Sequence, residues 1–207
     1  MSKRAITHLG SDPVMFRLIG HHGSIRLKPR RLPPFQSLTQ AIIYQQLSGK
    51  AAGTILGRFK LLFPGTEFPV PAQVLATPPD RLRAAGLSRP KAAYILDLAQ
   101  RCSLGLIPSL EDCDPLEDEA LIAKFTEIKG IGRWTVEMFL IFNLGRPDVL
   151  PVHDLGVRKG FQIAYHKRKL PEPERLADFG SKWAPHRTTA ARYLWLAADS
   201  PQSSPAP

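Results

Sequence analysis

The sequence has only two cysteines, Cys102 and Cys113, in 207 residues. Two thiols cannot form a four-thiolate zinc or iron–sulfur site, and a cytosolic disulfide is not expected, so both are interpreted as structural. Long apolar runs are also missing, because the longest, such as residues 138–142, fall far short of the roughly 18 residues of a membrane span. The N-terminus leads into no signal-like segment. These absences predict a soluble, cytoplasmic protein.

Acidic residues are in short supply. Eighteen Asp and Glu face 28 Lys and Arg, which gives a net charge of +10. This excess predicts a polyanionic partner, either nucleic acid or an anionic membrane, and no basic amphipathic helix supports the membrane. Six of the acids lie within residues 111–119, which contain no Lys or Arg. We expect this acidic stretch to face away from the polyanion.

Strand-like alternation is scarce too. Apolar residues recur at helical spacing, and Pro and Gly interrupt them often enough to predict an all-α fold of short helices. Asp12 and Pro13 supply a helix N-cap and a first helical residue. Helices are expected from there to residue 19, twice within residues 35–63 with a break near Ser48 and Gly49, and over residues 72–75, 79–85, 90–104, 116–125, 133–143, 154–165, 173–179 and 185–197. Residues 199–207 are expected to be a disordered tail.

Two glycines, Gly130 and Gly132, bracket one apolar residue between two helical patterns. Such glycines let the backbone turn tightly, and the helix that follows points its free N–H groups at the turn, where a phosphate would fit. The pair alone is equally well explained by an ordinary helix–turn–helix corner. Lys129, just before it, is interpreted as an exposed turn residue.

Asp154 follows an apolar approach that contains proline, and it opens a helix. Local sequence alone favours the role of a helix N-cap over a functional role, because Asp is well suited to that position. No nucleophile elbow lies near His153 and Asp154, so Ser–His–Asp hydrolysis is unsupported.

Four segments in a fixed order are more specific than any one of them. They are AIIYQQLS at 41–48, GLSRPK at 86–91, the hairpin at 125–137 with Asp154 after it, and residues 182–195. Together they make residues 12–198 resemble the helix-hairpin-helix superfamily of DNA glycosylases, and within it the alkylation-repair branch, the 3-methyladenine DNA glycosylase II group of bacteria and yeast. The resemblance implies two helical subdomains with a helix-hairpin-helix motif and a base-binding cleft between them. The extra N-terminal mixed domain of the larger bacterial members is expected to be absent.

The expected division of the chain follows this resemblance. Residues 1–34 should contain one helix and belong to the second subdomain, and residues 35–125 should form the first. Residues 126–198 should hold the hairpin, the Asp154 region and the C-terminal helices.

The activity implied by the resemblance is excision of alkylated bases, of the 3-methyladenine and 7-methylguanine type, from duplex DNA by a monomeric hydrolase of base excision repair. Breaking the N-glycosidic bond leaves positive charge on the deoxyribose, which a carboxylate can stabilise while it orients water. Asp154 matches the family's catalytic Asp. Bifunctional relatives carry a nucleophilic Lys where this chain has Trp134, so a monofunctional enzyme with water as nucleophile is expected. No cofactor is required.

The resemblance also implies a pocket for a base that has been flipped out of the duplex. Trp134 and Trp195 are expected to line it, with Trp195 stacking on the base, because electron-poor alkylated purines stack well on an indole. Met138 and Leu155 complete the pocket. Both stand where well-studied relatives have Tyr, so this pocket is less aromatic.

DNA contacts are expected in three segments of the chain. By resemblance, Gln46 is the wedge that fills the space of the flipped base, with Gln45, Leu47 and Ser48 beside it. The alternative is that Gln45 and Gln46 only satisfy backbone groups where two helices meet. Phosphates are expected at the amides of Gly130 and Gly132, the hydroxyl of Thr135, and Lys91 with Ser88. The carbonyls of Thr126, Ile128 and Ile131 match positions that bind a structural Na⁺ or K⁺ in relatives.

Two other interpretations stay open. A non-enzymatic helix-hairpin-helix module would use the same hairpin and basic surface but would not need Asp154. A bifunctional glycosylase/lyase for oxidised bases would form a covalent Schiff base with DNA.

Overall fold

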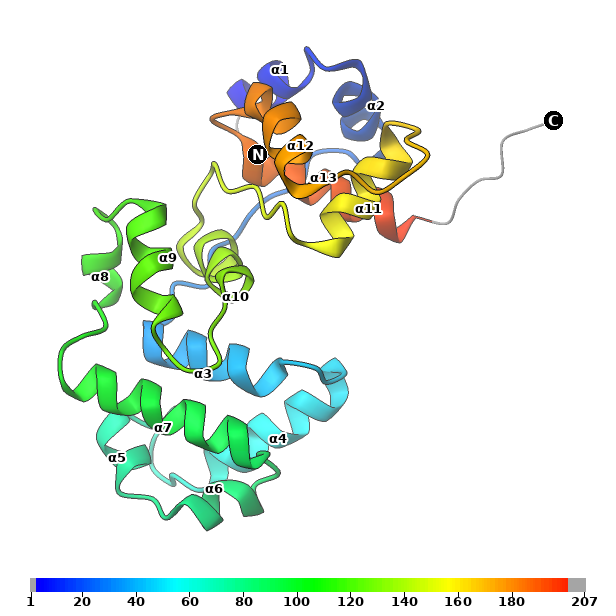
Figure 1. The fold of residues 1–207 in the computed structure, drawn as a ribbon. Helices are drawn as coiled ribbons and strands as arrows, with labels where there is room; N and C mark the ends of the chain where they lie inside the picture. Colours follow the sequence, from blue (N-terminus) through cyan, green and yellow to red (C-terminus); the bar gives the residue numbers. More distant parts are fainter. Residues whose placement is uncertain (1–2, 201–207) are drawn as a thin grey trace. The chain divides into compact units, whose positions relative to one another are not determined.

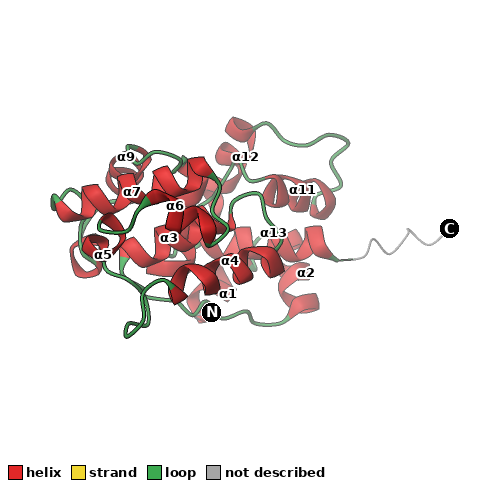
Figure 2. Ribbon diagram, turned by 90° about the horizontal axis from the view of Figure 1, so that it is seen from below, coloured by secondary structure: helices red, strands yellow, loops and turns green. Residues whose placement is uncertain are grey.

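The computed structural model describes residues 3–200, and this part of the chain is all-helical (Figures 1 and 2), which confirms the predicted fold class. No helix within it is long and apolar enough to cross a membrane. The helices are α1 (Lys3–Leu9), α2 (Pro13–His22), α3 (Pro34–Tyr44), α4 (Gly49–Leu61), α5 (Pro71–Leu75), α6 (Pro79–Ala84), α7 (Arg89–Ser103), α8 (Leu110–Cys113), α9 (Asp118–Thr126), α10 (Arg133–Met138), the π-helix η1 (Phe139–Leu144), α11 (Leu155–Ala164), α12 (Pro173–Gly180), the 3₁₀-helix η2 (Ser181–Trp183) and α13 (Arg187–Asp199).

The chain divides into two compact units. The central unit comprises Arg30–Phe139, and the terminal unit comprises the residues up to Pro29 together with those from Leu140 onward. The hairpin therefore belongs to the central unit, whereas we expected a boundary after residue 125. The physical reason is that Ile128 and Ile131 of the hairpin are buried and Gly130 packs on α7 of the same unit.

The core of the central unit is built on α3 and α7. Leu38, Ile42 and Ile43 of α3 are fully buried, as are Ile95 and Leu98 of α7. α3 packs on α7 and on α4, and α5 packs on α7. This core carries both the turn of residues 45–48, between α3 and α4, and the hairpin of residues 129–132, between α9 and α10.

The core of the terminal unit is built on α11 and α13, which lie side by side (Figure 1). Gly160 allows this close approach, because a Cβ at this position would overlap the carbonyl of Leu194. Met15 of α2, Trp183 and Tyr193 are buried in the same cluster. The N-terminal helices thus pack with the C-terminal ones.

The predicted and observed helices differ mainly where the helices are shortest. Asp12 caps α2, and the chain breaks at Ser48 between α3 and α4, as predicted. However, α1 and α8 were not predicted, so the described residues 3–33 hold two helices where we expected one. They span only seven and four residues, too few for a helical period to show. α13 extends through Asp199, and residues 201–207 of the predicted tail lie outside the described residues.

The helix predicted over residues 133–143 changes type along its length. α10 ends at Met138, and the next six residues form the π-helix η1. The N–H of Arg146 donates to the carbonyl of Leu140 at 2.9 Å where this segment ends. π-helical segments are rare and are frequent at functional sites. Here the segment carries Phe142, which reaches Trp195.

Candidate active site and nucleic-acid interface

Asp154 lies where α11 begins, and two donors hold one oxygen of its carboxylate. Oδ1 accepts the backbone N–H of Val157 at 2.8 Å and the indole Nε1–H of Trp195 at 2.8 Å. The first bond is the N-cap contact predicted from the sequence. The second was not predicted, and it fixes the direction of the carboxylate from a different helix, α13.

Trp195 is confined on more than one side. The ring of Phe142 stacks on its indole, with the centroids 5.7 Å apart and the planes 27° apart. A Cβ at Gly156 would lie 2.8 Å from Cδ1 of Trp195 and 3.1 Å from Oδ1 of Asp154. A side chain at position 156 would therefore disturb the hydrogen bond between the indole and the carboxylate. The expected role of Trp195 as a stacking platform for the base stays a prediction. The structure shows in addition that Trp195 positions the carboxylate of Asp154.

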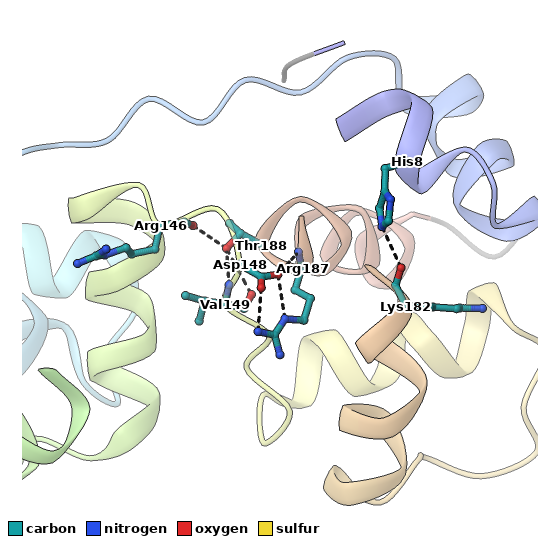
Figure 3. A network of polar contacts seen from close by, with 7 residues as sticks. All are labelled: His8, Arg146, Asp148, Val149, Lys182, Arg187 and Thr188. Carbon is teal, nitrogen blue, oxygen red and sulfur yellow. Dashed lines mark hydrogen bonds and ion pairs between the residues drawn. The ribbon is translucent and has the colours of Figure 1, made fainter. Parts of the chain in front are cut away.

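The loop that leads from η1 toward α11 is anchored to the start of α13 (Figure 3). Arg187 donates to Asp148 from its backbone N–H at 3.0 Å and from Nε and Nη2 at 2.9 Å each. The hydroxyl of Thr188 accepts the N–H of Val149 at 2.9 Å and donates to the carbonyl of Arg146 at 2.7 Å. The first turn of α13 thus holds the loop, and a later turn of the same helix holds the carboxylate.

The other predicted pocket residues are divided between the units. Trp134 and Met138 lie four residues apart on α10 in the central unit, where Trp134 is 49% exposed and Met138 is half-buried. Leu155, beside Asp154 in the terminal unit, is 63% exposed. At this exposure Trp134 is not a residue of the core. The pocket role of all three stays a prediction.

The predicted wedge lies in the turn between α3 and α4. Gln46 is exposed with φ +56°, a left-handed conformation that is uncommon outside glycine, and Leu47 beside it is 39% exposed. Ser48 uses its hydroxyl to cap α4. Gln45 donates from Nε2 to the carbonyl of Gly130 at 2.9 Å. The two glutamines therefore differ, because Gln45 satisfies a backbone group while Gln46 faces outward.

Lys91 has protein partners where we predicted a phosphate. Its Nζ donates to the carbonyls of Ile43 at 2.8 Å and Gln45 at 2.7 Å, at the end of α3. Ser88, expected beside it on the phosphate, accepts the Lys91 N–H and caps α7. Burial lowers the pKa of the Lys91 ammonium. These carbonyl partners could not be predicted from local sequence, because they lie more than forty residues from Lys91 along the chain.

The hairpin glycines are placed as predicted for a tight turn. Both Gly130 and Gly132 are exposed, and Gly130 has φ +78°. A Cβ at Gly130 would also overlap the ring of Tyr94, so this position requires glycine for two reasons. Thr135 is only 6% exposed, which does not fit its predicted contact with a phosphate.

The predicted cation ligands are backbone carbonyls of the hairpin. Ile128 and Ile131 bury their side chains, so the carbonyl is the group that each can offer to a cation. The carbonyl of Ile128 accepts the N–H of Ile131 at 3.0 Å. A carbonyl oxygen has a second lone pair, so this bond does not prevent coordination. With the carbonyl of Thr126, the donor set suits a hard monovalent cation.

Three residues that shape the packing of α13 near Asp154 were not predicted, namely Phe142, Gly156 and Gly160. Phe142 fell within a run interpreted as an ordinary α-helix, which does not show the π-helical turn that carries it. Gly156 and Gly160 lie four residues apart on α11, so they share a face. That pair of small residues was the available signal for close packing against another helix.

Comparisons with known proteins show the family of the chain. Residues 39–186 match the family described as HhH-GPD superfamily base excision DNA repair protein. The chain is 38% identical over 181 residues to DNA-3-methyladenine glycosylase 1 of Schizosaccharomyces pombe, covering 87% of this chain and 79% of the relative. Its structure matches the S. pombe 3-methyladenine DNA glycosylase in complex with abasic DNA with a TM-score of 0.83 at 38% identity, over 93% of this chain and 95% of that one. A DNA-3-methyladenine glycosidase from Bacillus halodurans matches with a TM-score of 0.87 at 38% identity, over 96% and 90%.

The all-helical fold, the Gly-x-Gly hairpin and an aspartate at the start of α11 define a helix-hairpin-helix protein of the base-excision type. The chain belongs to the HhH-GPD superfamily. The resemblance found in the sequence is thereby confirmed.

Proposed function

We propose that this protein is a monofunctional DNA glycosylase that flips alkylated bases of the 3-methyladenine and 7-methylguanine type out of duplex DNA and hydrolyses their N-glycosidic bonds. The observation that carries the proposal is the Asp154 carboxylate, held by the N–H of Val157 and the indole of Trp195 in a member of this family. The names of relatives 38% identical to the chain support the substrate class.

The chemistry asks for a fixed negative charge beside the sugar. As the bond to the base lengthens, positive charge develops on the deoxyribose, and a carboxylate close to the anomeric carbon lowers the energy of that state. An oxygen of the same carboxylate can accept a hydrogen bond from the water that attacks. Because two N–H groups already hold Asp154, little reorganisation is needed at the moment of reaction.

Trp134 supports hydrolysis by water. Glycosylases that also cut the strand use a lysine amine as nucleophile, and by family resemblance that lysine would stand where this chain has Trp134. Trp134 is 49% exposed, and an indole stacks well on an electron-poor base.

Double-stranded DNA that contains alkylated bases is the proposed partner, and the protein is proposed to act as a monomer. A substrate in the genome agrees with a cytoplasmic site of action, at the nucleoid in a bacterium. No cofactor takes part in the proposed chemistry. A Na⁺ or K⁺ on the carbonyls of Thr126, Ile128 and Ile131 would hold the hairpin in shape and would not touch the reacting atoms.

Asp154→Asn tests the proposal. Asn is an equally good N-cap and its side-chain carbonyl can accept the same two hydrogen bonds, so the variant removes the charge and keeps the architecture. We expect base release from methylated duplex DNA to fall by at least roughly a hundredfold, with DNA affinity retained. The measurement is single-turnover release of 3-methyladenine, 7-methylguanine, ethenoadenine and 1-methyladenine from defined duplexes.

Two outcomes would contradict the proposal. Undiminished release by Asp154→Asn, or no release by the wild type with DNA binding intact, would favour a non-enzymatic DNA-binding module. A covalent DNA adduct trapped with borohydride would favour a bifunctional glycosylase/lyase.

A further inference from the structure

One face of α7 supports two turns that are far apart in the sequence. Lys91, Tyr94 and Asp97 follow one another at intervals of three residues, so they lie along one side of the helix. Lys91 binds the turn of residues 45–48, and Tyr94 and Asp97 contact the hairpin of residues 129–132. All of these residues belong to the central unit.

Lys91 holds the turn from its α3 side. α3 ends at Tyr44, so the last carbonyls of the helix have no intrahelical partner. The ammonium of Lys91 donates to two carbonyls there, those of Ile43 and Gln45, at 2.8 and 2.7 Å. A positive charge at a helix C-terminus is also favoured by the helix dipole.

Gln45 then connects the turn to the hairpin. Its backbone carbonyl accepts from Lys91, while its side-chain Nε2 donates to the carbonyl of Gly130 at 2.9 Å. α7 fixes the hairpin independently, because the Tyr94 ring occupies the space beside Gly130 and Asp97 accepts the N–H of Lys129 at 3.1 Å. Turn and hairpin therefore share one support and are bonded to each other.

The result is a turn that is held at both ends and free in the middle. Gln45 is bound as described, and Ser48 caps α4. Between them, Gln46 keeps its left-handed backbone and faces outward with Leu47. Such a conformation persists only where the surrounding structure enforces it.

We propose that Lys91 and Gln45 are positioning residues that lock the turn of residues 45–48 to the hairpin of residues 129–132, so that the two segments meet DNA as one rigid unit. This rests on the proposed function, in which the hairpin holds phosphates and the turn enters the base stack. A wedge works only at a fixed distance from the phosphates that the protein grips. A turn ordered before binding avoids the entropic cost of ordering it on the DNA.

Gln45→Ala and Lys91→Met, in the full chain, test the proposal on DNA. Both remove donors, and Lys124→Met, an exposed lysine of α9, is the control for the lost charge. The measurement is affinity for a duplex with a tetrahydrofuran abasic analogue and for an undamaged duplex, each over a range of salt concentrations. We expect both variants to lose roughly tenfold of the preference for the abasic duplex, with wild-type affinity and salt slope on undamaged DNA. Lys124→Met should keep the wild-type preference.

The salt slope separates this role from a phosphate contact. If Lys91 bound a phosphate, Lys91→Met would weaken binding to both duplexes alike and lower the slope by about one, and that result would overturn the proposal. An unchanged preference in both variants would overturn it too. Gln45→Ala deletes no charge and no core group, so it keeps the test valid if Lys91→Met fails to fold.

Hydrogen exchange of the DNA-free protein tests the coupling between the turn and the hairpin without relying on the proposed function. Loss of the Gln45 side chain should speed exchange of the backbone amides of residues 129–132 by roughly tenfold, because those amides lose their link to the turn. Unchanged exchange there would refute the coupling. Failure of the wild type to release any base would refute the proposed function and leave this measurement decisive.

Discussion

One of the two N–H groups that hold the Asp154 carboxylate comes from an indole. Trp195 donates that hydrogen bond at 2.8 Å while Phe142 stacks on its ring. The indole of Trp195 therefore has two roles: it holds the carboxylate, and it is the expected platform on which a base stacks.

Trp195→Phe separates the two roles. The phenyl ring can still stack on Phe142, but it has no N–H for Asp154. We expect the single-turnover rate of base release to fall roughly tenfold or more, as is usual when a charged acceptor loses a donor. Phe142→Leu is the comparison, since it removes the stacked ring and keeps the N–H, and it should lose less activity. Equal losses in the two variants would argue against a positioning role for the hydrogen bond.

At the level of helices, the sequence predicted what local patterns can determine. Asp12 and Pro13 marked the start of α2, and Ser48 and Gly49 marked the break between α3 and α4, because caps and breakers act within a few residues. The π-helix after Met138 was not predictable in this way. Its six residues are too few to distinguish its period from that of an α-helix.

Contacts over long sequence distances limited the prediction of the site. The N-cap contact of Asp154 was predicted because it lies within a few residues along the chain, and its catalytic role was assigned by family resemblance. Lys91 was assigned to DNA as a cation near the start of a helix. Its carbonyl partners at the end of α3 lie more than forty residues away along the chain, so the sequence did not reveal them. Thr135 was assigned to a phosphate because its hydroxyl lies close to the hairpin along the chain. It is only 6% exposed, and this burial comes from tertiary packing, which the sequence did not reveal.

α2 is tied to α11 and η2 through a buried carboxylate, which predicts a dependence of stability on pH. Asp12 accepts from Tyr165 at 2.6 Å, Lys182 at 3.0 Å and Trp183 at 3.3 Å. Burial raises the pKa of Asp12, but these hydrogen bonds outweigh it and the pKa lies below its ordinary value. Because the folded pKa is the lower one, this stabilisation is present above about pH 4 and is lost as the pH falls through the folded value.

Tyr165→Phe removes one of these donors. We expect the pKa of Asp12 to rise, acid unfolding to begin at a higher pH, and the free energy of unfolding at pH 7 to fall by about 1–2 kcal/mol.

Burial and then the bond to Asp12 raise the pKa of Tyr165 itself. The wild type should therefore lose stability above about pH 10, where the unfolded tyrosine ionises, and the variant should lose less. Urea unfolding between pH 2 and pH 11 measures both effects, with Tyr44→Phe, an exposed tyrosine, as the control. Identical acid profiles would contradict the assignment.

At the scale of the whole molecule, the net charge of +10 is distributed unevenly. In the acidic stretch of residues 111–119, Asp114 pairs with Arg31 and Glu119 pairs with Arg133. Part of that negative charge is therefore neutralised within the central unit. The expectation that the stretch faces away from DNA stays a prediction.

The charge excess predicts an affinity that depends strongly on salt. Binding to undamaged duplex should weaken by at least roughly a hundredfold between about 50 and 200 mM salt, because each phosphate contact releases counterions. Fluorescence anisotropy across that range measures the slope. The single-turnover rate at saturating protein should change little, since it does not include the encounter. An affinity that does not change with salt concentration would show that the basic surface does not contribute to DNA binding.

The terminal unit is assembled from both ends of the chain, which has a consequence for biosynthesis. Asp12 finds Trp183 across 171 residues of sequence. At the usual rates of translation, of the order of 5–20 residues per second, roughly 10 to 30 s separate the appearance of these two partners. The contiguous central unit can complete its core during that interval, while α1 and α2 still lack the helices that cover them. α1 and α2 are thus synthesised before the helices that bury them, and they are the natural segment for a chaperone to protect.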